Sequence, residues 1–97
     1  MAEFTTRRPM KRQPTHPGAL MRETIEEHLG LSKSEVARRM KISRASLYAV
    51  LGGTSAVTAD MAVRFAAIGG GEPQLLLNMQ AAFDLWHARQ KPENLVA

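Results

Sequence analysis

Arg44 and the residues around it carry the side chains best suited to reading DNA. An arginine can bind the O6 and N7 atoms of guanine through two hydrogen bonds. Ser43, Ala45 and Ser46 are small enough to let a helix approach base edges, and Tyr48 suits a sugar-phosphate group or a thymine methyl group. The pattern predicts a helix that enters the major groove. Two alternatives stay open: Arg44 contacts a phosphate or only solvent, and Tyr48 packs against its own domain.

Candidate phosphate contacts flank this segment on both sides. Lys33 and Ser34 begin the preceding helix, where free N–H groups and the helix dipole favour an anion. Thr54 and Ser55 come just after the groove-facing segment and are expected to hold the next phosphate. The pair Arg38–Arg39 is divided between phosphate and solvent, and neither residue is assigned alone.

Two short helices joined by a tight turn must position these residues. Ser32 and Glu35 have the spacing of a capping box at the start of the first helix, and Ser43 is suited to cap the second. Each helix has an apolar stripe where the two must cross: Val36, Ala37 and Met40 on the first, and Leu47, Val50 and Leu51 on the second. Small or apolar residues at the crossing and polar residues elsewhere are typical of a helix-turn-helix.

The rest of the chain predicts three more helices and no strand. They run from Pro17 to Gly30, from Thr58 to the glycines at 69–71, and from Pro73 to about His87 or Gln90. Their expected inner residues are Leu20, Thr24, Ile25 and His28 or Leu29 in the first, and Met61, Phe65 and Ile68 in the second. We therefore expect an all-α fold of five helices. Residues 1–15 are predicted to be a flexible basic arm, 16–91 the domain and 92–97 a tail.

The fifth helix is more apolar than a helix with one covered face requires. The side chains expected to pack inward are Leu75, Met79, Phe83 and Trp86. A second apolar side consists of Leu76, Leu77, Ala81 and Leu85. A small domain cannot bury both sides, so the sequence favours a two-fold dimer with Leu76, Leu77, Ala81 and Leu85 in the interface. The alternative is a wide core stripe with a few exposed leucines.

The composition favours an anionic partner and argues against an enzyme. The 97 residues include 13 Lys and Arg against 9 Asp and Glu, a net charge of +4, and no cysteine, so no disulfide or thiolate metal site is expected. The histidines are scattered, the glycine run at 69–71 is not followed by the Lys-Ser or Lys-Thr of a phosphate-binding loop, and no nucleophile motif is present, so no metal, cofactor or catalytic residue is expected. No apolar run is long enough for a bilayer and no signal peptide is recognised, which is compatible with the cytoplasm.

Several of these segments together resemble the HigA family of antitoxins, within the phage-repressor-like helix-turn-helix class. The matching pieces are His16-Pro17-Gly18, the segments 31–40 and 42–53, the run Thr58-Ala59-Asp60-Met61-Ala62, and the runs Leu77-Asn78-Met79-Gln80-Ala81 and Asp84-Leu85-Trp86. Lys41 departs from the pattern, because this class usually has glycine in the turn. A lysine held there in the left-handed conformation should cost about 1 kcal/mol. The glycine run at 69–71 and the long basic arm are further departures.

The resemblance implies a repressor of its own operon that also neutralises a HigB-like ribonuclease toxin. A ribonuclease needs a basic surface, and the acidic cluster of this chain is Glu23, Glu26 and Glu27, so the toxin is expected to dock there. These glutamates could instead only solubilise an exposed face. A stand-alone phage-type repressor without a toxin and a protein-interaction module that no longer reads DNA are the rival functions.

Overall fold

The computed structural model describes residues 12–69 and 71–95, and over these residues the protein is all-α, as the sequence predicts. The five α-helices are α1 (Pro17–Thr24), α2 (Lys33–Met40), α3 (Arg44–Leu51), α4 (Ala59–Gly69) and α5 (Pro73–Gln90). A π-helical turn, η2 (Ile25–Leu29), continues α1, and a 3-10 turn, η3 (Pro92–Asn94), follows α5. Within the described part no residue is in a strand. Arm residues 1–11, Gly70 of the glycine run and tail residues 96–97 lie outside the described residues.

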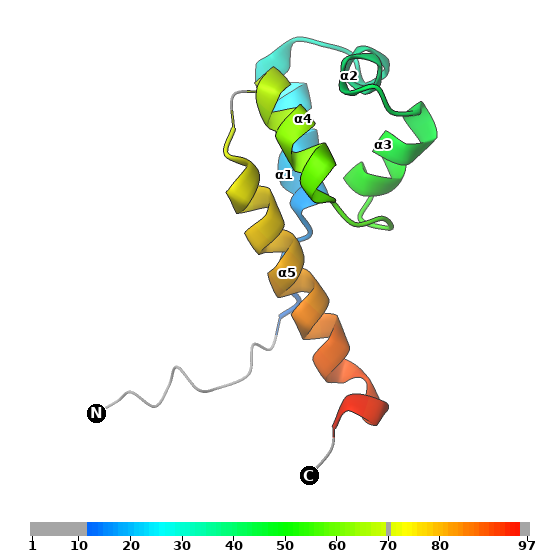
Figure 1. The fold of residues 1–97 in the computed structure, drawn as a ribbon, viewed down its shortest axis with the longest axis vertical. Helices are drawn as coiled ribbons and strands as arrows, with labels where there is room; N and C mark the ends of the chain where they lie inside the picture. The colour runs from blue at the N-terminus through cyan, green and yellow to red at the C-terminus, as the bar shows by residue number, and fades with distance from the viewer. Residues whose placement is uncertain (1–11, 70, 96–97) are drawn as a thin grey trace, which may run out of the picture.

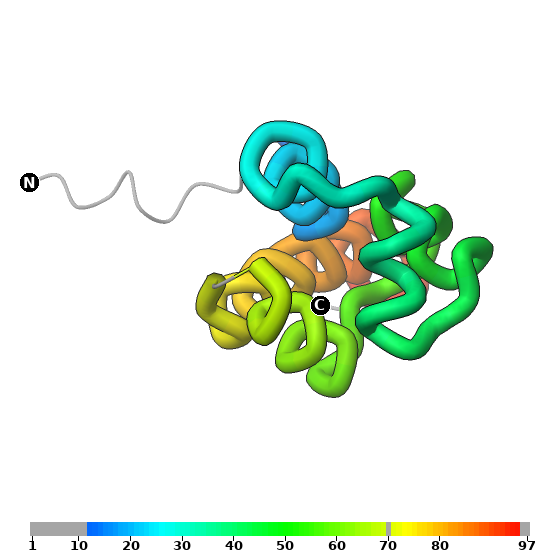
Figure 2. The backbone as a smooth tube through the Cα atoms, turned by 90° about the horizontal axis from the view of Figure 1, so that it is seen from above, coloured from blue at the N-terminus to red at the C-terminus, as the bar shows by residue number. Residues whose placement is uncertain are grey.

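The helices form one packed unit from which half of α5 extends. α1 and α4 pack against α5, while α2 and α3 lie together at one side of the molecule (Figures 1 and 2). The C-terminal half of α5 continues past the other α-helices (Figure 1). Residues 12–15, which the sequence assigns to the arm, lie near this half of α5. The side chain of Gln13 is hydrogen-bonded to it, with 2.9 Å between Gln13 Nε2 and His87 Nε2.

Side-chain caps start the helices, largely as the sequence predicts. Ser32 Oγ accepts from the Glu35 N–H at 3.1 Å, and Ser43 Oγ accepts from the Ser46 N–H at 3.0 Å. Thr58 Oγ1 accepts from Met61 N–H at 3.2 Å at the start of α4. Only half of the predicted capping box forms, because the Glu35 carboxylate binds two arginines of α2 instead of reaching back along the chain.

The core lies where α1, α2, α3, α4 and α5 meet. Its buried apolar residues are Met21, Ile25, Val36, Ala37, Met40, Leu47, Val50, Leu51, Val57, Ala62, Phe65 and Leu76. The predicted stripes of α2 and α3 are confirmed. In α1 the expected inner residues Leu20, Ile25 and Leu29 do pack in or against the core, whereas His28 is exposed and Met21, which was not expected there, is fully buried. Residues four apart, Pro17, Met21 and Ile25, face the core, and the wider π turn then moves His28 outward.

Gly18 sets how closely α1 and α3 approach each other. A Cβ atom at this position would lie 1.9 Å from the carbonyl oxygen of Val50. The clash is with backbone rather than with a flexible side chain, so only glycine fits here.

The helix-turn-helix turn contains the one non-glycine residue with positive φ among the described residues. Lys41 has φ 61° and ψ 41°, which confirms the left-handed conformation expected from the sequence. The N–H groups of Lys41 and Ile42 bind the carbonyls of Arg38 and Ala37 at 3.1 Å each and close α2. Two hydrogen bonds thus hold Lys41 in a conformation that a side chain disfavours.

The structure corrects the assignment of the two apolar sides of α5. Leu76, expected in a dimer interface, is 5% exposed and belongs to the core, whereas Leu75, expected inward, is 49% exposed. Leu77 is partly buried against the core, and Ala81 and Leu85 are exposed. The register differs because the core contacts α5 through Leu76 and Gln80, four residues apart, rather than through the Leu75 side.

Candidate nucleic-acid interface

The outer surface of α3 is small and polar, as a groove-facing helix requires. Arg44, Ala45, Ser46 and Tyr48 are exposed, and the helix is held from behind by Leu47, Val50 and Leu51. The Ser43 hydroxyl donates to Ser46 Oγ at 2.9 Å. Ser46 therefore keeps its own hydroxyl proton for an outside acceptor, such as a base edge or a phosphate.

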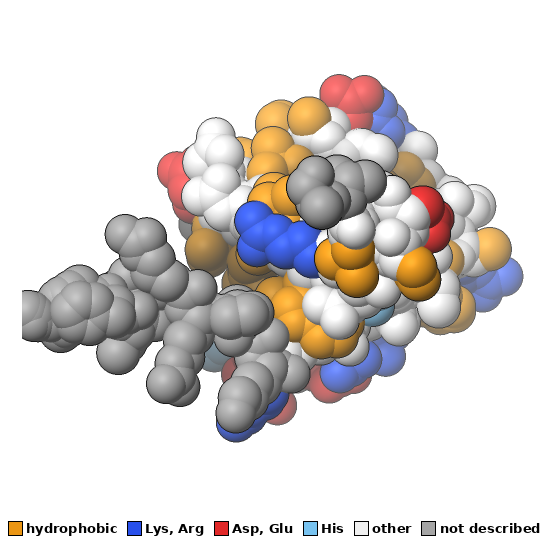
Figure 3. Space-filling view, turned by 90° about the horizontal axis from the view of Figure 1, so that it is seen from below, with side chains coloured by type: hydrophobic (Ala, Val, Ile, Leu, Met, Phe, Trp, Pro, Cys, Tyr) orange, Lys and Arg blue, Asp and Glu red, His pale blue; other side chains and the backbone are white. Residues whose placement is uncertain are grey.

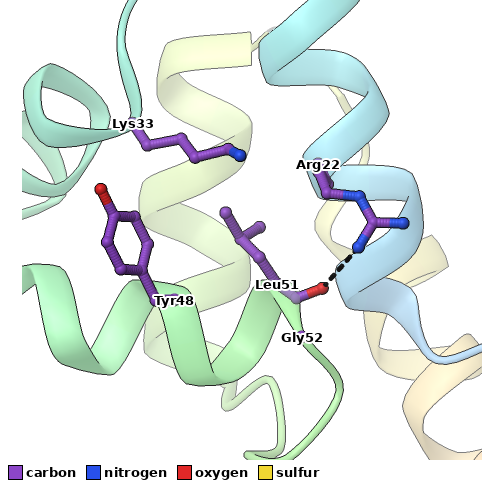
Figure 4. A pocket seen from close by; sticks show the side chains of 5 residues that line it. All are labelled: Arg22, Lys33, Tyr48, Leu51 and Gly52. Atoms are coloured by element: carbon purple, nitrogen blue, oxygen red, sulfur yellow. Dashed lines mark hydrogen bonds between the residues drawn. The ribbon is translucent and has the colours of Figure 1, made fainter.

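A shallow hollow of about 300 Å³ lies beside α3 and contains two cationic side chains. It is lined by Arg22 of α1, Lys33 of α2, and Tyr48, Leu51 and Gly52 (Figure 4). Arg22 Nη1 donates to the Leu51 carbonyl at 3.3 Å, so Arg22 also caps the C-terminal end of α3. Two cations and a phenol around one hollow are suited to hold a phosphate group. Arg22 could not be assigned to this face from the sequence, because its position at the end of α3 depends on how α1 crosses α3.

Lys33 links this hollow to the acidic cluster. Lys33 Nζ lies 3.2 Å from Glu26 Oε2, and both side chains are partly exposed. A pair of this kind is weak enough for a phosphate to compete for the lysine. Glu26 of the acidic cluster therefore borders the DNA face, whereas Glu23 and Glu27 are exposed on the same helical segment.

Arg38 and Arg39 both bind Glu35 on the outer side of α2. Arg38 Nε donates to Glu35 Oε1 at 3.1 Å, and Arg39 Nε donates to Oε2 at 2.8 Å. The hydrogen bonds from Arg38 and then Arg39 lower the pKa of Glu35 to about 2, so the carboxylate stays charged at any physiological pH. One of the two positive charges on this side of α2 is thereby neutralised.

The carbonyl oxygen of Ala49 accepts three hydrogen bonds from Thr54 and Ser55, the residues that follow α3. It accepts from Thr54 N–H at 2.9 Å, Thr54 Oγ1 at 3.1 Å and Ser55 N–H at 3.2 Å. Both residues are exposed. Because the Thr54 hydroxyl proton is already engaged, the Ser55 hydroxyl is the stronger candidate for donating to a phosphate.

Comparison with known proteins places this geometry in a family. No protein-family model matches the chain. Antitoxin HigA-1 of Vibrio cholerae is 31% identical over 84 residues, which cover 87% of this chain and 79% of the relative. The chain belongs to the HigA family of antitoxins. YddM of Escherichia coli K12, described as an uncharacterized HTH-type transcriptional regulator, is 35% identical over 74 residues, 76% of this chain and 78% of that protein.

Solved structures of HigA proteins share the fold. An antidote protein of the HigA family from Coxiella burnetii has a TM-score of 0.74 and 31% identity, covering 89% of this chain and 98% of that one. Pseudomonas aeruginosa antitoxin HigA, solved with the higBA promoter, has a TM-score of 0.69 and 27% identity, covering 77% of this chain and 82% of that one. The relatives are antitoxins and transcriptional regulators rather than enzymes. The protein is accordingly a non-enzymatic helix-turn-helix protein of the HigA type.

Proposed function

We propose that this HigA-family protein neutralises a HigB-like ribonuclease toxin and, as a dimer, represses the operon that encodes both. The observation that carries the DNA-binding part is the outer surface of α3, where exposed Arg44, Ala45, Ser46 and Tyr48 adjoin the cationic hollow of Arg22 and Lys33. The P. aeruginosa HigA with its promoter supports the same function. A repressor of this kind acts in the cytoplasm, and none of the described helices is long and apolar enough to cross a membrane.

Arg44→Ala tests direct reading of the operator. If Arg44 binds guanine through two hydrogen bonds, the variant should lose about 1–3 kcal/mol per half-site and should no longer discriminate at one base pair. Gel shifts with the upstream promoter and with single-base operator variants measure this loss. Lys91→Ala, which removes the same charge after the end of α5, is the control. A loss that is equal for all sequences would assign Arg44 to a phosphate instead, and no binding by the wild-type protein would contradict DNA binding altogether.

The exposed part of α5 supports a dimer. Leu85 is 52% exposed and Leu95 67% exposed, and both line an apolar hollow of about 490 Å³ with Trp86 and Pro14. Viewed from this end of the molecule, apolar side chains form patches between charged ones (Figure 3). A second copy related by two-fold symmetry would cover the patch and place two α3 helices for the half-sites of an inverted repeat.

The acidic segment supports the toxin contact. Glu23 and Glu27 are exposed, and they offer negative charge to a protein that must bind RNA through a basic surface. Glu26 is partly engaged by Lys33, so it is the less available of the three.

Replacing Glu23 and Glu27 together by lysine should weaken toxin binding by about tenfold or more, because like charges would then meet at the interface. Leaving Glu26 in place preserves its pair with Lys33, so operator binding should not fall. The measurement is affinity for the ribonuclease-like protein encoded by the neighbouring reading frame, with an operator gel shift alongside. Glu72→Lys with Glu93→Lys gives the same change of net charge elsewhere and should bind toxin normally. Wild-type neutralisation by the Glu23/Glu27 variant would place the docking site elsewhere.

A stand-alone repressor is the second candidate function. It is favoured by relatives such as YddM, which is described as a transcriptional regulator. Absence of a neighbouring frame for a small basic protein, together with intact operator binding, would support this alternative.

A further inference from the structure

The segment from Gly53 to Val57 lies between α3 and α4 and contains the candidate phosphate contacts Thr54 and Ser55. It is not part of any helix, so its position depends on what holds it. Side chains from two other parts of the fold bind it, one near each end.

His16 holds the first end. Its Nδ1 accepts the N–H of Gly18 at 2.9 Å, and the ring also forms a hydrogen bond with the backbone of Ser55. A Cβ atom on Gly53 would lie 3.7 Å from the ring, and the ring meets Phe83 of α5 edge-on with centroids 4.9 Å apart. Since Nδ1 is an acceptor, the ring is neutral and has its proton on Nε2, which makes it a donor toward the Ser55 carbonyl.

Gln80 holds the other end. Its side-chain Oε1 accepts the Val57 N–H at 2.8 Å, and its Nε2 donates to Asp84 Oδ1 at 2.9 Å. Gln80 is 6% exposed, and among the residues that the structure describes it is the one buried polar side chain. The bond to Asp84 fixes which way the amide points, so Oε1 is turned toward Val57.

We propose that His16 and Gln80 are positioning residues for operator binding: they clamp the segment 53–57 onto α1 and α5, and thereby hold Ser55 and its neighbours against the DNA backbone. The inference rests on the DNA-binding part of the proposed function and adds to it residues that need not touch DNA. It also gives α5, the helix assigned to dimerisation, a direct link to the DNA face.

The clamp should open when His16 takes up a proton. Protonated Nδ1 would carry a hydrogen toward the Gly18 N–H, so two donors would face each other. Burial lowers the pKa of His16 from its ordinary 6.5, against opposing effects of the Ser55 bond and the Asp84 charge. A lowered pKa means that the unfolded or unclamped chain binds the proton more tightly, so the clamp is intact above pH 6.5 and weakens as the pH falls below it.

The charged and titratable groups on the elements around His16 are few. Asp84, His87 and Arg89 lie on α5, Arg22 and Glu23 on α1, and Arg12 in the segment before His16, whereas residues 53–57 have none. Acidification in general makes a protein more positive and should strengthen its binding to DNA. Opening of the clamp should lower the affinity for DNA on acidification, whereas the general electrostatic effect should raise it. A loss of affinity at low pH therefore indicates protonation of His16.

The test compares His16→Asn with wild type in operator binding from about pH 7.5 to about pH 5.5. Asparagine can still cap α1 but is too short to reach Ser55 and Phe83. We expect the variant to bind roughly tenfold more weakly at the higher pH, equally for operator and mutated operator, and to show no further loss on acidification. Gln80→Met should weaken binding similarly but keep the pH-dependent loss. His28→Asn, at an exposed histidine, should behave as wild type.

Thermal unfolding and sedimentation at each pH ensure that only folded protein of equal oligomeric state is compared. An independent readout is the NMR titration of the free protein, in which the amides of Gly18, Ser55 and Val57 should shift together with a midpoint below 6.5 in wild type and not in His16→Asn. Equal affinity and pH dependence in wild type and His16→Asn, or amides that do not titrate, would overturn the clamp. Titrating amides in a protein that binds no operator at any pH would instead overturn the proposed function, and with it the role of the clamp in DNA binding.

Discussion

Raising the salt concentration from about 50 to about 200 mM should weaken operator binding by about 10³–10⁵-fold, because two copies would neutralise on the order of 6–10 phosphates. We expect the cations around the helix-turn-helix to contribute most. Arg22, Lys33, Lys41 and Arg44 lie on or beside the helix-turn-helix, and two copies of these four side chains fall within that range. Arg38 and Arg39 add less, because they share the carboxylate of Glu35.

The slope of the logarithm of affinity against the logarithm of salt concentration measures this contribution. Arg22→Ala should reduce the slope by about one per copy if Arg22 neutralises a phosphate, and Lys91→Ala, which removes the same charge just after the end of α5, should leave it unchanged. A slope near zero for the wild-type protein would contradict binding through the phosphate backbone.

The helix-turn-helix could be predicted from the sequence because local signals determine it. Serine caps, apolar residues three and four apart, and a turn closed by two backbone hydrogen bonds depend on neighbours within a few residues. The left-handed backbone at Lys41 was predictable for a different reason: the resemblance to the HigA family gives the position of the turn.

The remaining features depend on how distant elements pack, and sequence spacing does not contain that information. Arg22 and Tyr48 line the same hollow only because α1 crosses α3 at Gly18. Gln80 is polar, yet it is buried, and its Oε1 supplies the acceptor for the N–H of Val57, which is distant in the sequence. Leu75 and Leu76 differ by one position, and the side of α5 that meets the core is set by the tertiary contact alone.

Leu85→Lys should convert the proposed dimer to a monomer and lower operator affinity by about 10³-fold or more, toward the level of non-specific binding. A lysine at this position would be buried without a partner in the two-fold interface, which is costly. In the monomer it would remain in water, since Leu85 is 52% exposed, so the fold should be retained. Leu85 is the sharper test than Leu77, because Leu77 also packs against the core and its replacement would weaken the domain itself.

Val63→Lys provides the matched control for this prediction. Val63 is 58% exposed on α4, so the change adds the same charge to an exposed apolar position outside the proposed interface. Sedimentation gives the oligomeric state, circular dichroism the helix content, and a gel shift the operator affinity of each variant. A monomer must bind each half-site separately, so Leu85→Lys should lose both the dimer and the operator affinity. Val63→Lys should retain both. A Leu85→Lys protein that remains a dimer would move the interface to another surface, and a monomer with full operator affinity would remove the need for two half-sites.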